Sequence, residues 1–158
     1  MARKRKAEPP KSDLERLREW LGTYPGYDLK GNMLVDYLDK VPGAKSLSPG
    51  GLEEISRAEN IWGETTVQSR YNFGLYITVE KAPGDDVGAA YNADWVLDFQ
   101  KWVQAQSVSG LTPTFGNIEQ SKEQMKAENG ALYETDQEGV GVYVVALSVE
   151  FKTKYEVI

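Results

Sequence analysis

Apolar side chains recur at every second position in two long stretches of the chain. The first covers residues 67–81 and includes Phe73 and Ile77, with polar residues between the apolar ones. The second covers residues 139–157, where one face stays apolar through Val145 and beyond. A period of two is typical of a β-strand with one buried face. We therefore predict two long strands, over residues 67–81 and 139–157.

Two other stretches carry apolar residues at helical spacing. The first predicted helix covers residues 12–21, begins at Ser12 and has Glu15 in position to complete a capping box. The second covers residues 92–107, with Asn92 as its candidate N-cap. Each helix has an apolar stripe suited to docking on a sheet. The stripes are Leu14, Leu17, Trp20 and Leu21 in the first helix, and Trp95, Phe99, Trp102 and Val103 in the second.

Clusters of Gly, Pro and Asn divide the rest of the chain. The Pro-Gly-Gly sequence at residues 49–51 and the Asn-Gly sequence at residues 129–130 predict turns. Short strands are expected before the first turn, over residues 33–38 and 44–48, and a hairpin is expected at the second. Residues 52–62 are ambiguous, because their apolar residues follow neither period.

The order of these elements predicts an α+β fold. We expect a mostly antiparallel, twisted sheet with two helices packed on one face. The chain has 158 residues, a length that suits a single domain, and we assign residues 12–158 to it. Residues 1–11 are polar and end in a Pro-Pro pair, so we expect a disordered basic arm there.

The chain contains neither cysteine nor histidine. Without thiols there can be no disulfides, thiolate nucleophiles or cysteine-type zinc sites. Without imidazole the commonest general base near neutral pH is missing, and with it the Ser-His-Asp type of catalysis. Only carboxylates, lysines, tyrosines and oxygen-bound metals remain for chemistry. We expect a protein that is not an enzyme and has no cofactor.

Charge is distributed unevenly along the chain. Residues 1–11 hold five basic residues and one acidic residue, which leaves 13 basic and 23 acidic residues for the remainder. An acidic body repels the phosphate backbone of nucleic acids. We interpret the arm as a solvated terminus, and contact with DNA or an acidic partner is the alternative. The arm is not followed by an apolar stretch of the kind that a secretory signal or a membrane span needs, so we expect a cytoplasmic, non-membrane protein.

Other candidate chemistry has an ordinary structural explanation. The acid pairs Asp85-Asp86 and Glu53-Glu54 could bind a hard cation, but they lack the ladder of a calcium loop, and we interpret them as solvated loops. Asp94 and Asp98 share a helix face and are interpreted as surface charge. The glycine-rich spots, including residues 49–51, match no phosphate-binding motif and are interpreted as turns. The four tryptophans are assigned to core packing rather than to base stacking.

The length of the two predicted strands points to contacts between copies. Strands of this length often extend beyond their own core, and their open edges are then a liability unless another chain covers them. We predict subunit contacts in the loop 82–92, on the polar faces of residues 68–80 and 148–154, and in the segment 39–51. The candidate contact residues are Lys40, Lys45, Arg70, Glu80, Asp85, Asp86, Glu150, Lys152 and Lys154.

In order and spacing of elements, residues 12–156 resemble the small tail-terminator (tail-completion, or minor capsid) proteins of long-tailed bacteriophages. No single motif in this pattern is specific, and the basic arm departs from it. The segments that carry the resemblance are residues 17–21, 35–38, 46–49, 70–75, 92–95 with the helix to Trp102, 130–133 and 142–147.

The resemblance implies a structural protein of the virion. Such a protein forms a ring, hexameric in the family, on the head-proximal end of the tail tube. It stops tube polymerisation and joins the tail to the head connector. Its partners would be its own copies, the tail tube protein and the connector or stopper protein, with assembly in the host cytoplasm. DNA would pass through the lumen without specific binding, and acidic residues lining that channel would let it slide.

Two other classes of function stay open from the sequence. One is a different neck or tail component, such as a head–tail stopper or a tube-like subunit. The other is a monomeric binding module that acts through the basic arm. A ring protein should have a mass that is a multiple of 17.6 kDa, whereas a binding module should stay monomeric.

Overall fold

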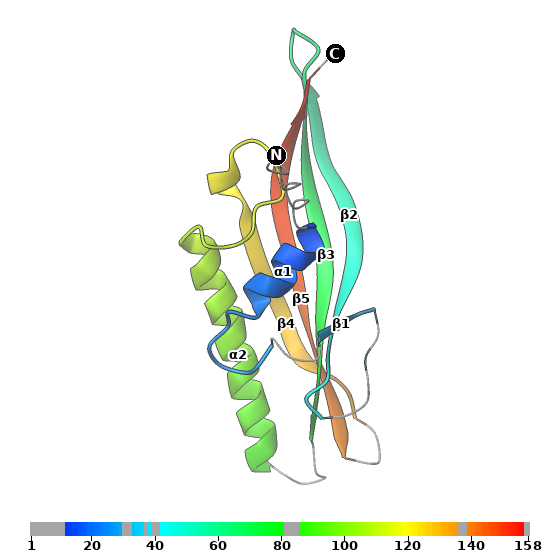
Figure 1. Cartoon of the computed structure of the whole chain (residues 1–158), viewed down its shortest axis with the longest axis vertical. Helices are drawn as coiled ribbons and strands as arrows, with labels where there is room; N and C mark the ends of the chain where they lie inside the picture. Colours follow the sequence, from blue (N-terminus) through cyan, green and yellow to red (C-terminus); the bar gives the residue numbers. More distant parts are fainter. Residues whose placement is uncertain are drawn as a thin grey trace, which may run out of the picture.

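A five-stranded mixed sheet and two helices form the α+β fold (Figure 1). The computed structural model describes residues 12–29, 33–36, 38, 42–80, 86–135 and 139–156, without the side chains of Asp86, Glu134 and Thr135. The elements are α1 (Asp13–Leu21), β1 (Met33–Val35), β2 (Lys45–Glu59), β3 (Thr65–Glu80), α2 (Asp86–Val108), the 3-10 turn η1 (Gln120–Lys122), β4 (Gln124–Thr135) and β5 (Val140–Tyr155). The basic arm lies outside the described residues.

The strands lie in the order β1-β2-β3-β5-β4. Only β1 and β2 run parallel, and the other three pairs are antiparallel, as predicted. The centre of the sheet is the long pair of β3 and β5, in which Phe73 lies opposite Leu147 and Leu75 opposite Val145. Both strands were expected from their alternating pattern, and their bounds agree with the prediction to within two residues.

Both helices pack against one face of this sheet. Leu17 and Leu21 of α1 and Phe99 of α2 belong to the same buried cluster as Leu75 and Val145 of the sheet. Odd-numbered residues of β3 and β5 point into that cluster, so the even-numbered ones form the opposite, helix-free face. Trp20 of α1 stacks on Trp102 of α2 with 5.0 Å between the ring centroids, which joins the two helices.

The helix starts are partly as expected. Ser12 caps α1, because its hydroxyl accepts a hydrogen bond of 3.2 Å from the backbone N–H of Glu15. The prediction for α2 was wrong, since this helix begins at Asp86 and Asn92 lies within it. Asn92 is buried, and its side-chain oxygen accepts a hydrogen bond from the indole N–H of Trp95 at 3.1 Å. Asn92 therefore accepts a hydrogen bond from a core tryptophan and does not cap the start of the helix.

Both Gly-containing turns of the prediction are β-bulges. Residues 45–59 form one continuous strand, whose register shifts between Pro49 and Gly51, with Gly51 at φ 91°. The expected hairpin at residues 129–130 is likewise a register shift within β4, with Asn129 at φ 56°. A bulge adds one residue to a strand and keeps its direction, so the chain does not reverse at either place.

The first predicted strand is shorter than expected. β1 ends at Val35, and Asp36 has a left-handed backbone with φ 54°. An extended strand cannot continue through that conformation. The predicted residue 37 lies outside the described part of the chain.

One end of the sheet extends beyond both helices. Figure 1 shows the turn between β2 and β3 at the far end of the molecule, above α1 and α2 in the view. Every residue of β2 from Gly50 to Glu59 is exposed to solvent. The prediction that long strands extend beyond their own core is confirmed for this end.

Candidate assembly interface

The outer edge of β2 is open over most of its length. β1 pairs only with Lys45, Ser46 and Leu47, and no other described strand pairs with this edge. The remaining backbone N–H and C=O groups on that side form a template for pairing with another chain. Leu52 and Ile55 lie on this stretch and are exposed.

The opposite edge of the sheet is covered in part, at Met125 and Ala127 of β4. The side-chain amide of Gln100 on α2 donates a hydrogen bond of 3.0 Å to the carbonyl of Ala127 on β4. The backbone N–H of Met125 donates one of 2.9 Å to the hydroxyl of Ser107, also on α2. Helix α2 therefore occupies outward-pointing backbone groups of β4, and among the described strands β2 offers the longer open edge.

Arg70 and Glu150 meet on the helix-free face of the sheet. They are direct cross-strand partners, and Arg70 donates to Glu150 at 2.6 Å. Arg70 also pairs with Glu53 of β2 at 3.4 Å, so three strands contribute to one charged row. The hydrogen bond to Glu150 raises the pKa of the Arg70 guanidinium above its usual range. The sequence prediction placed Arg70 and Glu150 on polar faces, and the structure brings them together.

Lys152 and Lys154 continue this face toward the far end. Lys152 pairs with Glu119 at 2.8 Å, and Lys154 pairs with Glu64 at 2.8 Å. The hydrogen bond from Lys152 lowers the pKa of Glu119, and the one from Lys154 lowers the pKa of Glu64. Lys152 and Lys154 therefore each have an acidic partner within the same chain.

Lys45 is a correction to the prediction. Its side chain is only 5% exposed and lies 3.9 Å from Asp28, with its ammonium 5.8 Å from the centre of the Tyr27 ring. Burial lowers the pKa of this ammonium. Lys45 follows the alternation of β2 onto the helix side, so in the folded chain it offers no surface to a second copy.

The other predicted contact residues are described only in part. Glu80 is exposed at the end of β3. Asp86 is the first residue of α2, without a described side chain, and Lys40 and Asp85 lie outside the described residues. The loop reading of Glu53-Glu54 was wrong, because both residues lie in β2, where Glu53 pairs with Arg70 and Glu54 with Arg57.

Sequence reasoning missed the turn between β2 and β3. Ile61 and Trp62 at this turn are 90% and 74% exposed, the first of them more than any other large apolar residue that the structure describes. Trp20 and Trp95 are buried and Trp102 packs against the core, so the core assignment was wrong for Trp62 alone among the four tryptophans. The sequence position of Trp62 could have revealed the turn, because Trp62 lies directly before Gly63, shortly before the predicted long strand.

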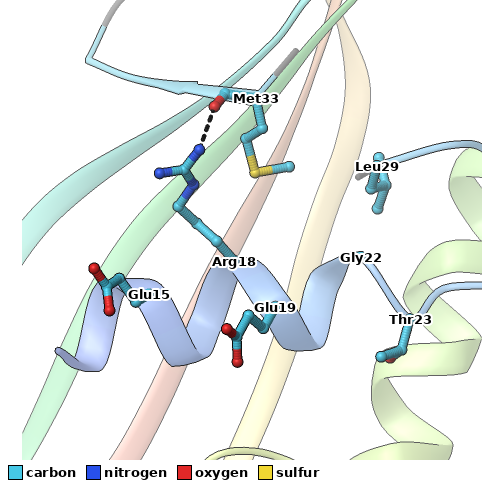
Figure 2. A pocket seen from close by; sticks show the side chains of 7 residues that line it. All are labelled: Glu15, Arg18, Glu19, Gly22, Thr23, Leu29 and Met33. Atoms are coloured by element: carbon cyan, nitrogen blue, oxygen red, sulfur yellow. Dashed lines mark hydrogen bonds between the residues drawn. The ribbon is translucent and has the colours of Figure 1, made fainter. Parts of the chain in front are cut away.

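An open pocket lies beside α1. Its volume is about 510 Å³, and it is bordered by Glu15, Arg18 and Glu19 of α1 and by Leu29 and Met33 beyond it. Figure 2 shows Arg18 reaching across to β1, where it donates a hydrogen bond of 2.7 Å to the carbonyl of Met33. The pocket is thus lined by both charged and apolar residues.

The described residues contain no group of three or more acidic side chains that could hold a metal ion. Asp98 accepts a hydrogen bond of 2.5 Å from the hydroxyl of the buried Tyr24, which gives this carboxylate a structural role. None of the described helices combines the length and apolar character needed to cross a membrane.

Comparison with family models and with curated proteins identifies no relative. No family model matches the chain, and no curated protein has a matching sequence. The open edge, the charged face and the exposed turn are therefore the features from which a function can be inferred.

Proposed function

We propose that this chain is a non-enzymatic structural subunit that assembles into a closed ring. The observation that carries the proposal is the open outer edge of β2, which continues into an exposed apolar turn. A monomeric protein protects such an edge by pairing or covering it, or by proline, charges and bulges; β2 has Pro49 and two bulges, but Leu52 and Ile55 stay exposed on its open stretch. The second edge, at β4, is covered in part by α2, so the two sides of the sheet differ. Different surfaces meeting head to tail produce a ring when the rotation between copies closes.

The resemblance of the element pattern to phage tail terminators supplies the biological setting of the proposal. In this setting a hexameric ring caps the head-proximal end of the tail tube, ends tube polymerisation and joins the tail to the head connector. The partners are further copies, the tube protein and the connector protein, within the virion. The in-chain carboxylate partners of Arg70, Lys152 and Lys154 support passage of DNA without tight binding, because paired cations attract phosphate less.

Native mass, measured by light scattering with and without tail tubes, tests this function. A particle of six times 17.6 kDa, free or bound to tube ends, is the expected result. Electron microscopy of tubes grown with the chain present should then show shorter tubes with one capped end. A chain that stays monomeric at all concentrations and leaves tube growth unchanged contradicts the proposal.

A further inference from the structure

The side of α2 that faces away from the core carries exposed apolar residues. They are Val87, Tyr91, Leu97 and Val108, and the two valines near the ends of the helix are 82% and 85% exposed. Asp94 and Lys101 lie between them on the same side and are also exposed. The six residues follow helical spacing along the whole of α2, and we call them the outer face of α2. Figure 1 shows α2 beside β4, across the sheet from the open edge of β2.

The two charges of the outer face lack partners in the same chain. Within the described part of the chain, neither Asp94 nor Lys101 forms an ion pair, whereas Arg57 and Lys154 each pair with an acidic residue. Asp94 and Lys101 cannot reach each other, because seven residues of helix separate them by roughly 10 Å along the axis. Both charges therefore remain for a partner outside the chain.

The charges are placed for pairing with a second copy of the same helix. Reversal of α2 about a midpoint between Leu97 and Asp98 exchanges the positions of Asp94 and Lys101. Two copies packed antiparallel about this midpoint form the Asp94–Lys101 ion pair twice. A parallel arrangement would place Asp94 against Asp94 and Lys101 against Lys101, and like charges repel each other. The charges therefore favour an antiparallel pair.

The apolar residues follow the same symmetry. The reversal also exchanges Val87 with Val108, so an apolar contact forms at each end of the pair. Leu97 of one copy meets Leu97 of the other near the midpoint, and Tyr91 lies opposite Gln104. The outer face is thus complementary to itself in both charge and apolar character. An anionic lipid surface suits it less well, because the acidic residues of the face would be repelled.

We propose that the outer face of α2 binds the outer face of α2 in a second copy, antiparallel about a two-fold axis near Leu97. A two-fold contact uses the same surface on both copies and closes at two of them, so it predicts a dimer of twice 17.6 kDa. The inference goes beyond the proposed ring and does not rest on it, because this contact leaves the open edge of β2 free.

The size of the contact predicts its strength. α2 has 23 residues, which at 1.5 Å per residue give a length of roughly 35 Å. A contact along a single helix buries less than the roughly 800 Å² per partner of a standard stable interface. Exposed ion pairs add little to affinity and more to orientation. We therefore expect a reversible dimer with a Kd in the micromolar range.

Disulfide trapping tests the position of the two-fold axis, because the chain has no native cysteine. In Leu97→Cys the new thiols of two copies lie together near the axis, so oxidation should yield a covalent dimer on a non-reducing gel. Gln104→Cys is the matched control, since it is exposed on the same helix but lies roughly 20 Å from its own copy in the pair. It should yield at least tenfold less dimer, and equal yields overturn the inference.

Charge exchange tests the register of the pair. Asp94→Lys and Lys101→Asp, made separately, each turn both ion pairs into repulsions and should weaken dimerisation at least tenfold in sedimentation equilibrium. A mixture of the two variants places opposite charges together again and should recover the dimer. The chain that carries both substitutions should dimerise like the unmodified one. The inference is wrong if neither the mixture nor the double variant recovers.

A further variant separates this contact from a general effect of charge. Lys126→Asp changes the net charge as much as Lys101→Asp does, and Lys126 is exposed on β4, away from the outer face of α2. It should leave the dimer unchanged, and an equal loss of dimer would overturn the inference. Capping of tail tubes by the unmodified chain decides the ring separately. Capped tubes without a trapped dimer discard only this contact, and a trapped dimer without capped tubes discards only the ring.

Discussion

Individual carboxylates of this protein differ in how folding changes their pKa. Glu64 and Glu119 are held by lysines on the surface, and these hydrogen bonds lower their pKa. Glu123 is 7% exposed and accepts hydrogen bonds from the backbone N–H groups of Phe115 and Gly116, at 2.7 and 3.2 Å. Burial raises the pKa of Glu123, and these two hydrogen bonds offset part of the rise. The two kinds of carboxylate therefore contribute to stability in opposite pH ranges.

Glu123→Gln tests this difference. The variant should be less stable by about 1–3 kcal/mol, because an amide has one acceptor oxygen for two buried N–H groups. A raised folded pKa means that the contribution of Glu123 is full below its unfolded pKa and falls as pH rises through the folded pKa. The stability gap between the two proteins should therefore narrow from pH 4 to pH 7, as measured by urea unfolding. Glu119→Gln is the matched control. The difference in stability between this variant and the unmodified protein should widen from pH 4 to pH 7.

At the level of helices and strands, the strands with regularly alternating apolar and polar residues could be predicted. The bulges that interrupt strands could not. The two long strands followed from the period of two, and α1 followed from its cap and apolar stripe. The Pro-Gly-Gly and Asn-Gly sequences were misassigned because a turn and a bulge both use residues that tolerate positive φ, as Gly51 and Asn129 do. Only the partner strand distinguishes them. The start of α2 was missed for a similar reason, since an Asn can satisfy a tryptophan as well as a helix end.

The bulge in β4 also determines how closely α2 approaches the sheet. A methyl group added at Gly130 would lie 2.5 Å from a side-chain carbon of Val96 and 2.6 Å from the side-chain oxygen of Gln100. Gly130→Ala should therefore push α2 away from β4 and cost about 1–3 kcal/mol, the usual range for overpacking. The urea midpoint should fall with an unchanged slope. Gly74→Ala, which meets only the movable ring of Tyr76 at 3.0 Å, should cost less.

For the whole molecule, the sequence predicted which face most polar side chains of the long strands occupy, and it misplaced Lys45 and Trp62. Arg70, Glu150, Lys152 and Lys154 lie on the helix-free face, as their alternation implied. Lys45 is buried, because its position in β2 places it on the helix side. The exposed Trp62 was assigned to the core, since residue type alone favours burial and the extension of the hairpin beyond the helices depends on the complete fold.

Charge reversal tests whether the helix-free face takes part in assembly. Lys152→Glu with Lys154→Glu should weaken assembly at least tenfold if these side chains lie at a subunit contact. The reversal also breaks the in-chain pairs with Glu119 and Glu64. A swap of Lys154→Glu with Glu64→Lys restores one of these pairs and isolates the effect between copies. Unchanged native mass for the double reversal and for the swap would exclude this face from the interface.

The strand order has a consequence for how the chain reaches its folded state. β3 lies between β2 and β5, but β5 follows it only after α2 and β4 in the chain. The centre of the sheet therefore depends on long-range pairing, which is slow to form. During synthesis the hairpin of β2 and β3 emerges before α2, β4 and β5, with the β3 edge and most of the β2 edge open and its apolar turn exposed. Early encounters between incomplete copies are then a hazard, and refolding should give most soluble protein when the chain is dilute.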